Sequence, residues 1–414
     1  MAENVEIALI CCVFDKGLAD FVINNDKSFP QLAANKLGWM FIDGFESHFG
    51  RHLTVFSVIN VSSYPGFSKI LISARPATTR SGNDLVYIPY VNIKYLKHAM
   101  IVLTAFLMLM KWATRFGKQK KVLVSYSMYA PFPVLSRLMA VFFRVKTILI
   151  VPDVPEYMRI GTFTPWHMKV ILKINQMQSY YFTKYMDGYV FLTKYMTEKF
   201  PVKKGRFAVV EGCVEAAGDA AGRKKGSRRK ESGRILLYAG QLNSEYGVGL
   251  LLSAFRGIDN PDFRLWIFGD GPMREEVIRH CGRDNRIEYR GVVNSDELSG
   301  IYQEVTAVIN PRTSGGIFTR YSFPSKILDY LKSGKPAILC KLDGIPEEYF
   351  RYAYVIEEEN EKGFAKKIVE VLSKTDAELD SFGEKARSWV EENKNSRTQV
   401  GKIVRIIDDI LNDA

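Results

Sequence analysis

Short, almost continuously apolar runs alternate with helix-patterned segments in both halves of the chain. In the first half, the runs 120–127 and 146–153 flank a helical segment at 131–144. Strands that are apolar on both faces belong in parallel sheets covered by helices, and a helical crossover is the connection that parallel strands need. The second half repeats the alternation, with strands expected at 234–240, 263–272, 286–293 and 306–310. The sequence therefore predicts an α/β protein with two parallel sheets.

The composition supports two separately folded domains. The chain has 414 residues, of which 47% are apolar, and this is enough for two or three domains with cores of their own. Residues 216–232 are rich in Gly, Ala, Lys and Arg and have no apolar periodicity, which is typical of a linker. We therefore expect a Rossmann-like domain at 1–215, a basic linker at 216–232 and a second domain from residue 233 onwards.

Positive charge is concentrated in the first half. Residues 1–215 contain 26 Lys and Arg against 14 Asp and Glu, whereas residues 233–414 contain 25 against 29. A basic face docks on anionic lipid or on nucleic acid, or simply keeps a protein soluble, and the sequence leaves these readings open. The longest apolar run, 99–110, is too short to span a bilayer, and residues 7–13 lack the basic segment of a signal peptide.

The cysteines and histidines favour neither a disulfide framework nor a metal site. The five cysteines are an odd number and include the adjacent pair Cys11 and Cys12, which suits a reducing cytosol. The five histidines show no metal-ligand spacing, and no Asp-x-Asp pair follows an apolar strand. We therefore expect a cytoplasmic protein without a metal.

The densest polar chemistry follows the strand expected at 306–310. Ser322, Pro324 and Ser325 are residues that begin helices, since a short hydroxyl caps free N–H groups and proline fits the first turn. Gly334 ends this helix before the next strand. A helix N-terminus at the carboxyl edge of a parallel sheet offers N–H groups to a phosphate. The segment therefore predicts an anion-binding position.

Charged side chains surround that position. Arg312, Arg320 and Lys326 can add full positive charges, and Asp329 lies one turn into the helix, where a carboxylate can bind the vicinal diol of a ribose. The same residues also suit an ordinary strand–loop–helix–strand unit whose basic side chains are solvated. The residues by themselves leave both interpretations open.

A family resemblance favours the first interpretation. The segments YSFPSKILDYLKSGKP (321–336) and LDGIPEEY (342–349) resemble the signature of bacterial family-4 glycosyltransferases, retaining enzymes of the GT-B fold that assemble cell-surface polysaccharide. The resemblance implies two Rossmann-like domains facing a cleft, with a donor domain at 233–394 and a C-terminal helix at 395–414 that packs back on the N-terminal, acceptor-side domain. It also implies that Asp329 holds the ribose of a nucleotide-sugar, where glutamate is more usual.

The resemblance extends to the surroundings of the donor, a UDP- or GDP-linked sugar, and implies no other cofactor. The backbone at Gly291 and Val292 is expected to border the nucleobase. Together with the residues around the expected anion position, the candidates for donor binding are Gly240, Gln241, Gly291, Val292, Arg312, Arg320, Ser322, Phe323, Ser325 and Asp329.

The chain departs from the family pattern at three working positions. Gln241 and Tyr246 stand where an Arg and a Lys usually clamp the diphosphate, and Tyr321 stands where a first glutamate is usual. A departing diphosphate develops negative charge that the protein must offset. Our candidates for that charge are Arg312, Arg320, Lys326 and the helix N-terminus at 322–325.

The acceptor side is expected at two strand ends of the first domain. Ser127 belongs to the segment 125–129, where some family members carry a catalytic histidine. Asp153 follows the next strand and resembles an acidic residue of relatives, although a loop-capping aspartate fits the same position. Together with Tyr321 and Lys326, these two residues are our candidates for catalysis.

The resulting hypothesis is a hexosyltransferase that transfers a sugar, with retention of configuration, to a lipid-linked saccharide in exopolysaccharide biosynthesis. We expect a peripheral protein on the inner face of the membrane. The helical segment 164–186 is expected to contact that anionic surface through Trp166, Lys169 and Lys173, and a helix that faces the core fits the same pattern.

Three other functions fit the sequence less well. A degenerate relative that binds a nucleotide-sugar or a partner without transfer is motivated by Gln241, Tyr246 and Tyr321. Binding to nucleic acid through the basic half lacks any RNA-binding signature, so we expect no nucleic-acid partner. A nicotinamide-dependent oxidoreductase is disfavoured because no Gly-x-Gly-x-x-Gly follows a first strand.

Overall fold

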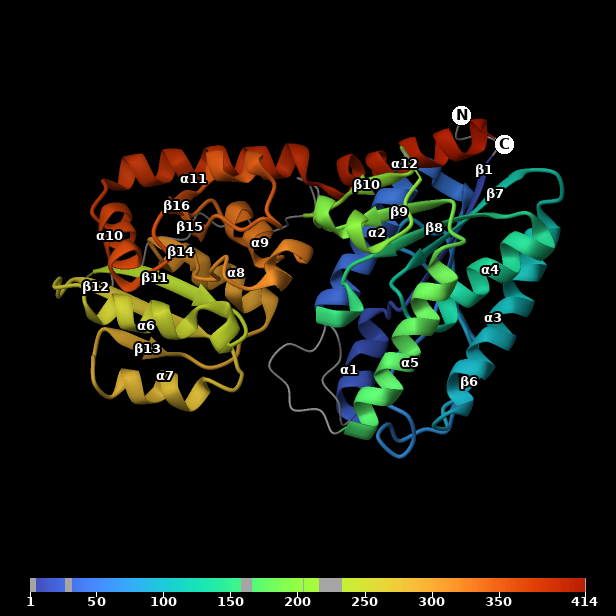
Figure 1. Ribbon diagram of the computed structural model, residues 1–414, viewed down its shortest axis with the longest axis horizontal. Coiled ribbons are helices and arrows are strands. Elements are labelled where there is room, and N and C mark those ends of the chain that lie inside the picture. Colours follow the sequence, from blue (N-terminus) through green and yellow to red (C-terminus); the bar gives the residue numbers. More distant parts are fainter. Residues whose placement is uncertain (1–4, 27–31, 158–165, 204, 216–232, 414) are drawn as a thin grey trace. The chain divides into compact units, whose positions relative to one another are not determined.

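The chain forms two compact units. The computed structural model describes residues 5–26, 32–157, 166–203, 205–215 and 233–413 (Figure 1). Unit 1 contains the described residues up to Cys213 together with those from Ser396 onwards, and unit 2 contains those from Val214 to Asn395. The linker expected at 216–232 lies outside the described residues.

Unit 1 is built on an eight-stranded sheet in the order β10-β9-β8-β7-β1-β2-β5-β4. Neighbouring strands are parallel except β4 and β5, which form an antiparallel edge. The central strands are buried along most of their length, as their continuous apolar runs predict. The strands of this sheet are β1 (Val5–Cys11), β2 (Leu53–Ser57), β4 (Arg75–Thr78), β5 (Asp84–Tyr87), β7 (Lys120–Tyr126), β8 (Lys146–Val151), β9 (Gly188–Phe191) and β10 (Phe207–Val209). A separate small sheet pairs β3 (Leu71–Ile72) with β6 (Tyr90–Val91).

The helices of unit 1 include one from the far end of the sequence. They are α1 (Lys16–Asn25), α2 (Leu32–Phe49), α3 (Leu96–Arg115), α4 (Pro131–Phe143), α5 (Trp166–Thr183) and α12 (Ser396–Asn412). Helix α12 packs on α2 so closely that a Cβ atom on Gly44 would lie 2.4 Å from Cγ2 of Val400. The chain crosses between the units after residue 213 and again after residue 395. The two crossings lie close together, because the amide of Val214 donates to the carbonyl of Lys394 at 2.8 Å.

Unit 2 is built on a six-stranded, wholly parallel sheet in the order β13-β12-β11-β14-β15-β16. Its strands are β11 (Arg234–Ala239), β12 (Phe263–Phe268), β13 (Ile287–Tyr289), β14 (Ala307–Asn310), β15 (Ala337–Cys340) and β16 (Tyr354–Ile356). Its helices are α6 (Val248–Arg256), α7 (Arg274–Cys281), α8 (Ser295–Glu304), α9 (Lys326–Lys332), α10 (Glu361–Leu372) and α11 (Asp376–Asn393). Helix α6 packs with α10, and α9 packs with α11.

Each sheet has one place where the strand order reverses. In unit 1 the chain extends from β1 to β2 on one side and to β7 on the other, and in unit 2 it extends from β11 to β12 and to β14. Loops that leave neighbouring strands in opposite directions open a crevice at the carboxyl edge of a parallel sheet, where such folds bind ligands. The loops after β11 and β14 therefore mark the place to examine in unit 2, and those after β1 and β7 the place in unit 1.

Most elements expected from the sequence are present, and helix α1 follows β1 after a short connection. Asp15 caps α1, because its side chain accepts from the amide of Leu18 at 2.9 Å. Helix α3 is also longer than the apolar run 99–110. Its most apolar 18-residue stretch has a mean hydropathy of 1.4, and it is the one helix among the described residues long and apolar enough, by length and composition alone, to cross a membrane.

Candidate functional site

Three glycine turns form a tightly packed backbone layer at the switch point of unit 2. Gly269 has a φ of +132°, and a Cβ atom there would lie 1.8 Å from the carbonyl oxygen of Gly240. The Gly269 amide also donates to the carbonyl of Gly291 at 2.8 Å. The backbone of Gly240 and Gly291, two of the expected donor-binding residues, is thus joined through Gly269, while the Val292 side chain beside them is 69% exposed.

The acidic residue in this layer has a structural task. The Asp270 carboxylate accepts from the amide of Gly271 at 2.9 Å, and the backbone carbonyl of Asp270 accepts from the amide of Leu242. A Cβ atom on Gly271 would lie 2.4 Å from the Leu242 carbonyl oxygen. The Gly-Asp-Gly turn therefore holds the loop after β11, including Gln241, close to the end of β12.

A buried cation lies at the start of the loop after β14. Arg312 is 8% exposed, and its Nη2 donates to the Ser322 hydroxyl at 2.9 Å. Its guanidinium carbon lies 5.1 Å from the centre of the Tyr246 ring and 4.4 Å from that of Phe318. Burial lowers the pKa of Arg312 to about 10, so the side chain stays charged at neutral pH.

The charge of Arg312 has no counterion within the described part of the chain. No described Asp or Glu forms an ion pair with it, and its buried Nε atom has no hydrogen-bond partner there. Cation–π contacts with two rings offset part of the cost of burying a charge, but a full counterion offsets more. The site therefore has an unmet preference for an anion.

Tyr246 is brought against Arg312 by a close backbone contact. Asn243 caps the 3₁₀ turn Ser244–Tyr246, which ends at Gly247 in the left-handed conformation. A Cβ atom on Gly247 would lie 2.0 Å from the carbonyl oxygen of Pro311, so only glycine allows the two loops to meet here. An aromatic ring thus stands where a clamping cation was expected, and Arg312 lies over that ring.

The serines expected to cap α9 do not cap it. The Ser322 hydroxyl accepts from Arg312 and donates to the Phe318 carbonyl at 2.9 Å, and Ser325 makes no capping hydrogen bond with its side chain. The amides of Ile327 and Leu328 donate to nearby backbone carbonyls, and α9 is only seven residues long. Our expectation that Ser322 and Ser325 cap this helix with their side chains is therefore wrong, while phosphate binding by its first amides stays a prediction.

Asp329 and Lys326 form an ion pair on the first turn of α9. Their charged atoms lie 3.6 Å apart, and the side chains are 36% and 40% exposed. The next residue, Tyr330, fixes this helix to the end of β11, since its hydroxyl bonds to the amide and carbonyl of Ala239 at 3.1 and 3.2 Å. The expected ribose-binding carboxylate is thus held on the helix that adjoins Gly240.

Two expected site residues are mostly core side chains. Tyr321, at the end of the 3₁₀ segment Ile317–Tyr321, is 7% exposed, and Phe323 is 5% exposed and packs on Tyr349 at 5.3 Å. Only the backbone of Phe323 is left to contact a ligand. Arg320, which directly precedes Tyr321 in the sequence, is partly exposed.

In unit 1, Ser127 lies at the switch point with a strained backbone. Its φ is +92°, a left-handed value that costs a non-glycine residue about 1–3 kcal/mol and is characteristic of functional sites. The amide of Tyr129 donates to its hydroxyl at 3.3 Å.

Asp153 follows the neighbouring strand β8 and reaches solvent. It makes no hydrogen bond or ion pair with another described residue, so it is not the loop-capping aspartate of our alternative reading. Desolvation by the surrounding protein nevertheless raises the pKa of Asp153 to about 6. Burial, together with the nearby Asp153 charge, raises the pKa of the Tyr126 hydroxyl.

Several residues near the unit 1 switch point were not foreseen. Lys97 at the start of α3 is 6% exposed, donates to the Val61 carbonyl, and has a pKa lowered to about 8 by burial. His98 packs on Tyr129 at 5.3 Å, and the buried Tyr129 hydroxyl has no hydrogen-bond partner among the described residues. No sequence motif marks these residues, because the fold alone brings them to the strand ends.

The expected membrane-contact residues are only partly described. The side chains of Trp166 and Lys169 lie outside the described part of the chain, and Lys173 is exposed. Among the described residues, no cluster of His, Cys, Asp and Glu is suited to hold a metal ion.

Comparison with known proteins bears on unit 2 first. Residues 233–374 match the protein family described as "Glycosyl transferases group 1". The match lies within unit 2 and covers less than half of the chain. The match spans β11 to the end of α10 and thus contains every donor-side residue named above. No curated protein sequence matches the chain.

Solved structures resemble the whole chain at low sequence identity. Sucrose-phosphate synthase from Thermosynechococcus elongatus is 12% identical with a TM-score of 0.64, and the alignment covers 99% of this chain and 100% of that one. The lipopolysaccharide outer core galactosyltransferase WaaB is 13% identical with a TM-score of 0.61, over 98% and 99%. Anabaena Alr3699/HepE in complex with UDP is 9% identical with a TM-score of 0.62, over 98% and 100%. The chain therefore has the GT-B fold, and a glycosyltransferase activity with a nucleotide-sugar donor is the function that these findings support.

Proposed function

We propose that the protein transfers a sugar from a nucleoside diphosphate to a saccharide acceptor. The observation that carries this proposal is the buried Arg312 guanidinium, which has no counterion among the described residues and lies at the switch point of the group 1 domain. A desolvated, preorganised cation stabilises a departing diphosphate far more strongly than an exposed one. In this chain Arg312 takes over the task of the missing clamp cations.

The remaining donor-side residues follow from their places around Arg312. Lys326 and Arg320 add positive charge at the diphosphate, and Asp329 exchanges its contact with Lys326 for the ribose diol. The backbone of Gly240, Gln241, Gly291 and Val292 borders the nucleoside, and the Ser322 hydroxyl orients the Arg312 fork. Ser325 and the backbone of Phe323 line the start of α9, and a catalytic role for the buried Tyr321 stays a prediction.

The finer assignment is a hexosyltransferase that retains configuration and builds polysaccharide on a lipid-linked acceptor. WaaB, a lipopolysaccharide outer core galactosyltransferase, and HepE, which was solved with UDP, support a UDP-sugar and a glycolipid as first choices. Ser127 and Asp153 orient the acceptor hydroxyl, and the protein works peripherally on the inner face of the cytoplasmic membrane.

The test is a panel of UDP- and GDP-sugars against the purified protein. We expect one donor to raise the melting temperature and to release nucleoside diphosphate when membrane lipid extract is added. Arg312→Gln is expected to abolish release, whereas Arg351→Gln, at an exposed position of the same unit, leaves it unchanged. A full panel without any binding would refute the proposal.

The non-catalytic alternative rests on Gln241 and Tyr246, which lack the charges of a clamp. It predicts that a nucleotide-sugar raises the melting temperature while no nucleoside diphosphate appears with any lipid extract. The two readings are thus separated by product formation and not by binding.

A further inference from the structure

A broad apolar surface covers one side of unit 1. Leu96, Leu103 and Leu107 on α3 are 44%, 54% and 49% exposed, and Val141 and Phe142 on α4 are 53% and 65% exposed. The α3 and α4 parts are continuous, because the Phe106 ring lies 6.2 Å from Phe142 and 6.1 Å from Phe143. We call Leu96, Leu103, Leu107, Val141 and Phe142 the α3–α4 face. A continuous exposed apolar surface with polar residues around it is typical of an interaction site.

The opposite side of α3 fixes how this helix can meet a membrane. Ile101, Ala105 and Leu109 are fully buried in the core of unit 1. A helix with one face buried in its own domain cannot be surrounded by lipid, as an isolated spanning helix is. Despite its length and hydropathy, α3 is therefore suited to lie in the plane of an interface with its other face in the acyl region.

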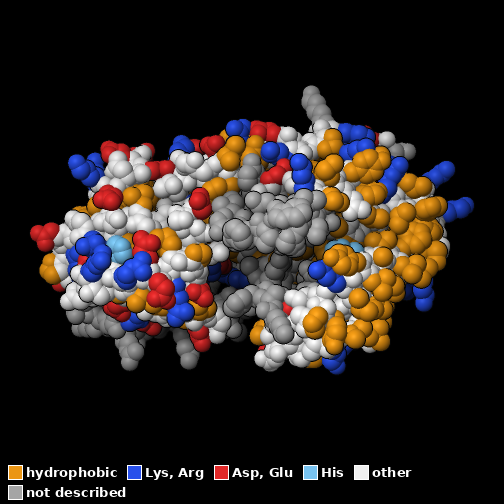
Figure 2. Space-filling model, turned by 60° about the horizontal axis from the view of Figure 1, so that its bottom comes forward, with side chains coloured by type: hydrophobic (Ala, Val, Ile, Leu, Met, Phe, Trp, Pro, Cys, Tyr) orange, Lys and Arg blue, Asp and Glu red, His pale blue; other side chains and the backbone are white. Residues whose placement is uncertain are grey.

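The charges around the face are of one sign. From Ser47 to Pro152 the sequence contains 14 Lys and Arg and a single acidic residue, Asp84. Exposed basic side chains flank the apolar residues at both ends of α3 and at the end of α4, namely Lys94, Lys111, Arg115, Lys118 and Arg144. Figure 2 shows hydrophobic side chains gathered over this part of unit 1, with Lys and Arg at their edge. Such a combination complements anionic lipid headgroups around an acyl core.

We propose that the α3–α4 face docks unit 1 on an anionic bilayer. The apolar residues enter the boundary between headgroups and acyl chains, and the flanking cations contact the phosphates. This surface differs from the α5 contact expected from the sequence. The proposal deepens the membrane assignment of the proposed function, but it requires no transfer reaction, so the two can fail separately.

The experiment is flotation of the full chain with phosphatidylcholine vesicles that contain 30% phosphatidylglycerol, without any sugar donor. We expect binding that falls at least about tenfold with pure phosphatidylcholine, and again between 0.1 and 1 M NaCl, because part of the attraction is screened. The apolar variant is Leu107→Gln with Phe142→Gln, and the basic variant is Lys111→Gln with Arg144→Gln. Each is expected to lower binding about tenfold.

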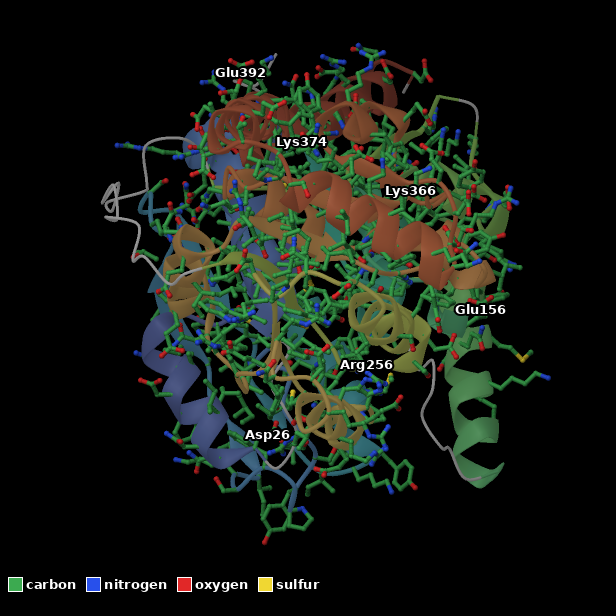
Figure 3. All side chains as sticks on the ribbon, turned by 90° about the vertical axis from the view of Figure 1, so that its left-hand side faces the viewer. Asp26, Glu156, Arg256, Lys366, Lys374 and Glu392 are labelled. Atoms are coloured by element: carbon green, nitrogen blue, oxygen red, sulfur yellow. The ribbon has the colours of Figure 1, made fainter. Side chains whose placement is uncertain are left out.

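Matched control variants are available on unit 2. Ile278→Gln with Val369→Gln removes exposed apolar residues, and Lys362→Gln with Lys366→Gln removes exposed cations of α10, where Figure 3 labels Lys366. Both are expected to bind as the unchanged protein does. Equal losses in controls and face variants would overturn the proposal. So would absence of vesicle binding together with a dimer that the apolar variant dissociates, because a second copy would then cover the face.

Discussion

The guanidinium carbon of Arg312 lies 5.1 Å from the centre of the Tyr246 ring. The two residues come from different loops at the switch point of unit 2, and Gly247 brings them together by its contact with Pro311. Tyr246 replaces a cation that the resembled family usually carries, and Arg312 supplies a cation from the facing loop. Under the proposed function, the positive charge at the diphosphate thus comes from the loop after β14 and not from the loop after β11.

The first prediction concerns the cost of this buried charge. Arg312→Met is expected to lower the rate of donor cleavage by about 10²–10³-fold, since one preorganised charge at a leaving group is worth that much. The same change removes an uncompensated buried charge, so we expect the ligand-free protein to gain on the order of 1 kcal/mol. Kinetics and thermal unfolding measure the two effects. A loss of both activity and stability would indicate that Arg312 is a structural residue.

The second prediction separates ribose binding from phosphate binding. Asp329→Ala is expected to weaken binding of the ribonucleotide about 10–100-fold, which is the loss of one or two charge-assisted hydrogen bonds. A 2′-deoxynucleotide should bind the unchanged protein weakly and should lose little more in the variant. Calorimetric titration measures both ligands, and Asp259→Asn at an exposed position serves as the control. Equal losses for the two nucleotides would exclude a contact with the ribose.

The third prediction uses the strain at Ser127. Because its φ of +92° suits glycine, Ser127→Gly is expected to stabilise unit 1 by about 1 kcal/mol. If the hydroxyl orients the acceptor, transfer should fall while hydrolysis of the donor stays the same. Denaturant unfolding and the two rates decide this. Unchanged transfer would remove Ser127 from the acceptor site.

The fourth prediction is a pH dependence at Asp153. Its pKa is raised from 3.8 to about 6, so the folded state binds the proton more tightly than the unfolded state does. The stability of the unchanged protein should therefore fall as pH rises from about 4 to about 6. Asp153→Asn should raise the melting temperature at pH 7.5 and leave it unchanged at pH 4. The effect should be modest because the side chain reaches solvent, and equal gains at both pH values would contradict it.

Local pattern was sufficient for most of the sheet and helix framework. Strands such as β7 and β8 are continuous apolar runs, and α4 between them has helical spacing, so their places follow from period and length. Helix α1 is hard to foresee from local pattern, because Gly17 and the polar residues near its C-terminus are typical of a loop. Its Asp15 cap was the signal that could have identified it.

The site was harder to foresee than the fold. Charge beside the expected anion position pointed to Arg312, and the resemblance pointed to Asp329. Nothing local to Arg312 indicates that it is buried between Tyr246 and Phe318. That arrangement depends on strand order and on close backbone contacts between loops far apart in sequence. The serines before α9 illustrate the reverse case. Their residue types favour capping, yet the Ser322 hydroxyl bonds to Arg312 because tertiary packing brings the guanidinium within reach.

The return of α12 to unit 1 decides how the protein can be divided in the laboratory. A fragment that stops near Glu215 would leave α2 without the helix that covers Gly44, and would leave Glu211 without its bond from Gln399 at 2.9 Å. Deleting the last turns of α12 would likewise lower the stability of unit 1. An independent unit 1 therefore needs residues 396–412 joined directly behind residue 213, which an internal deletion of unit 2 would achieve.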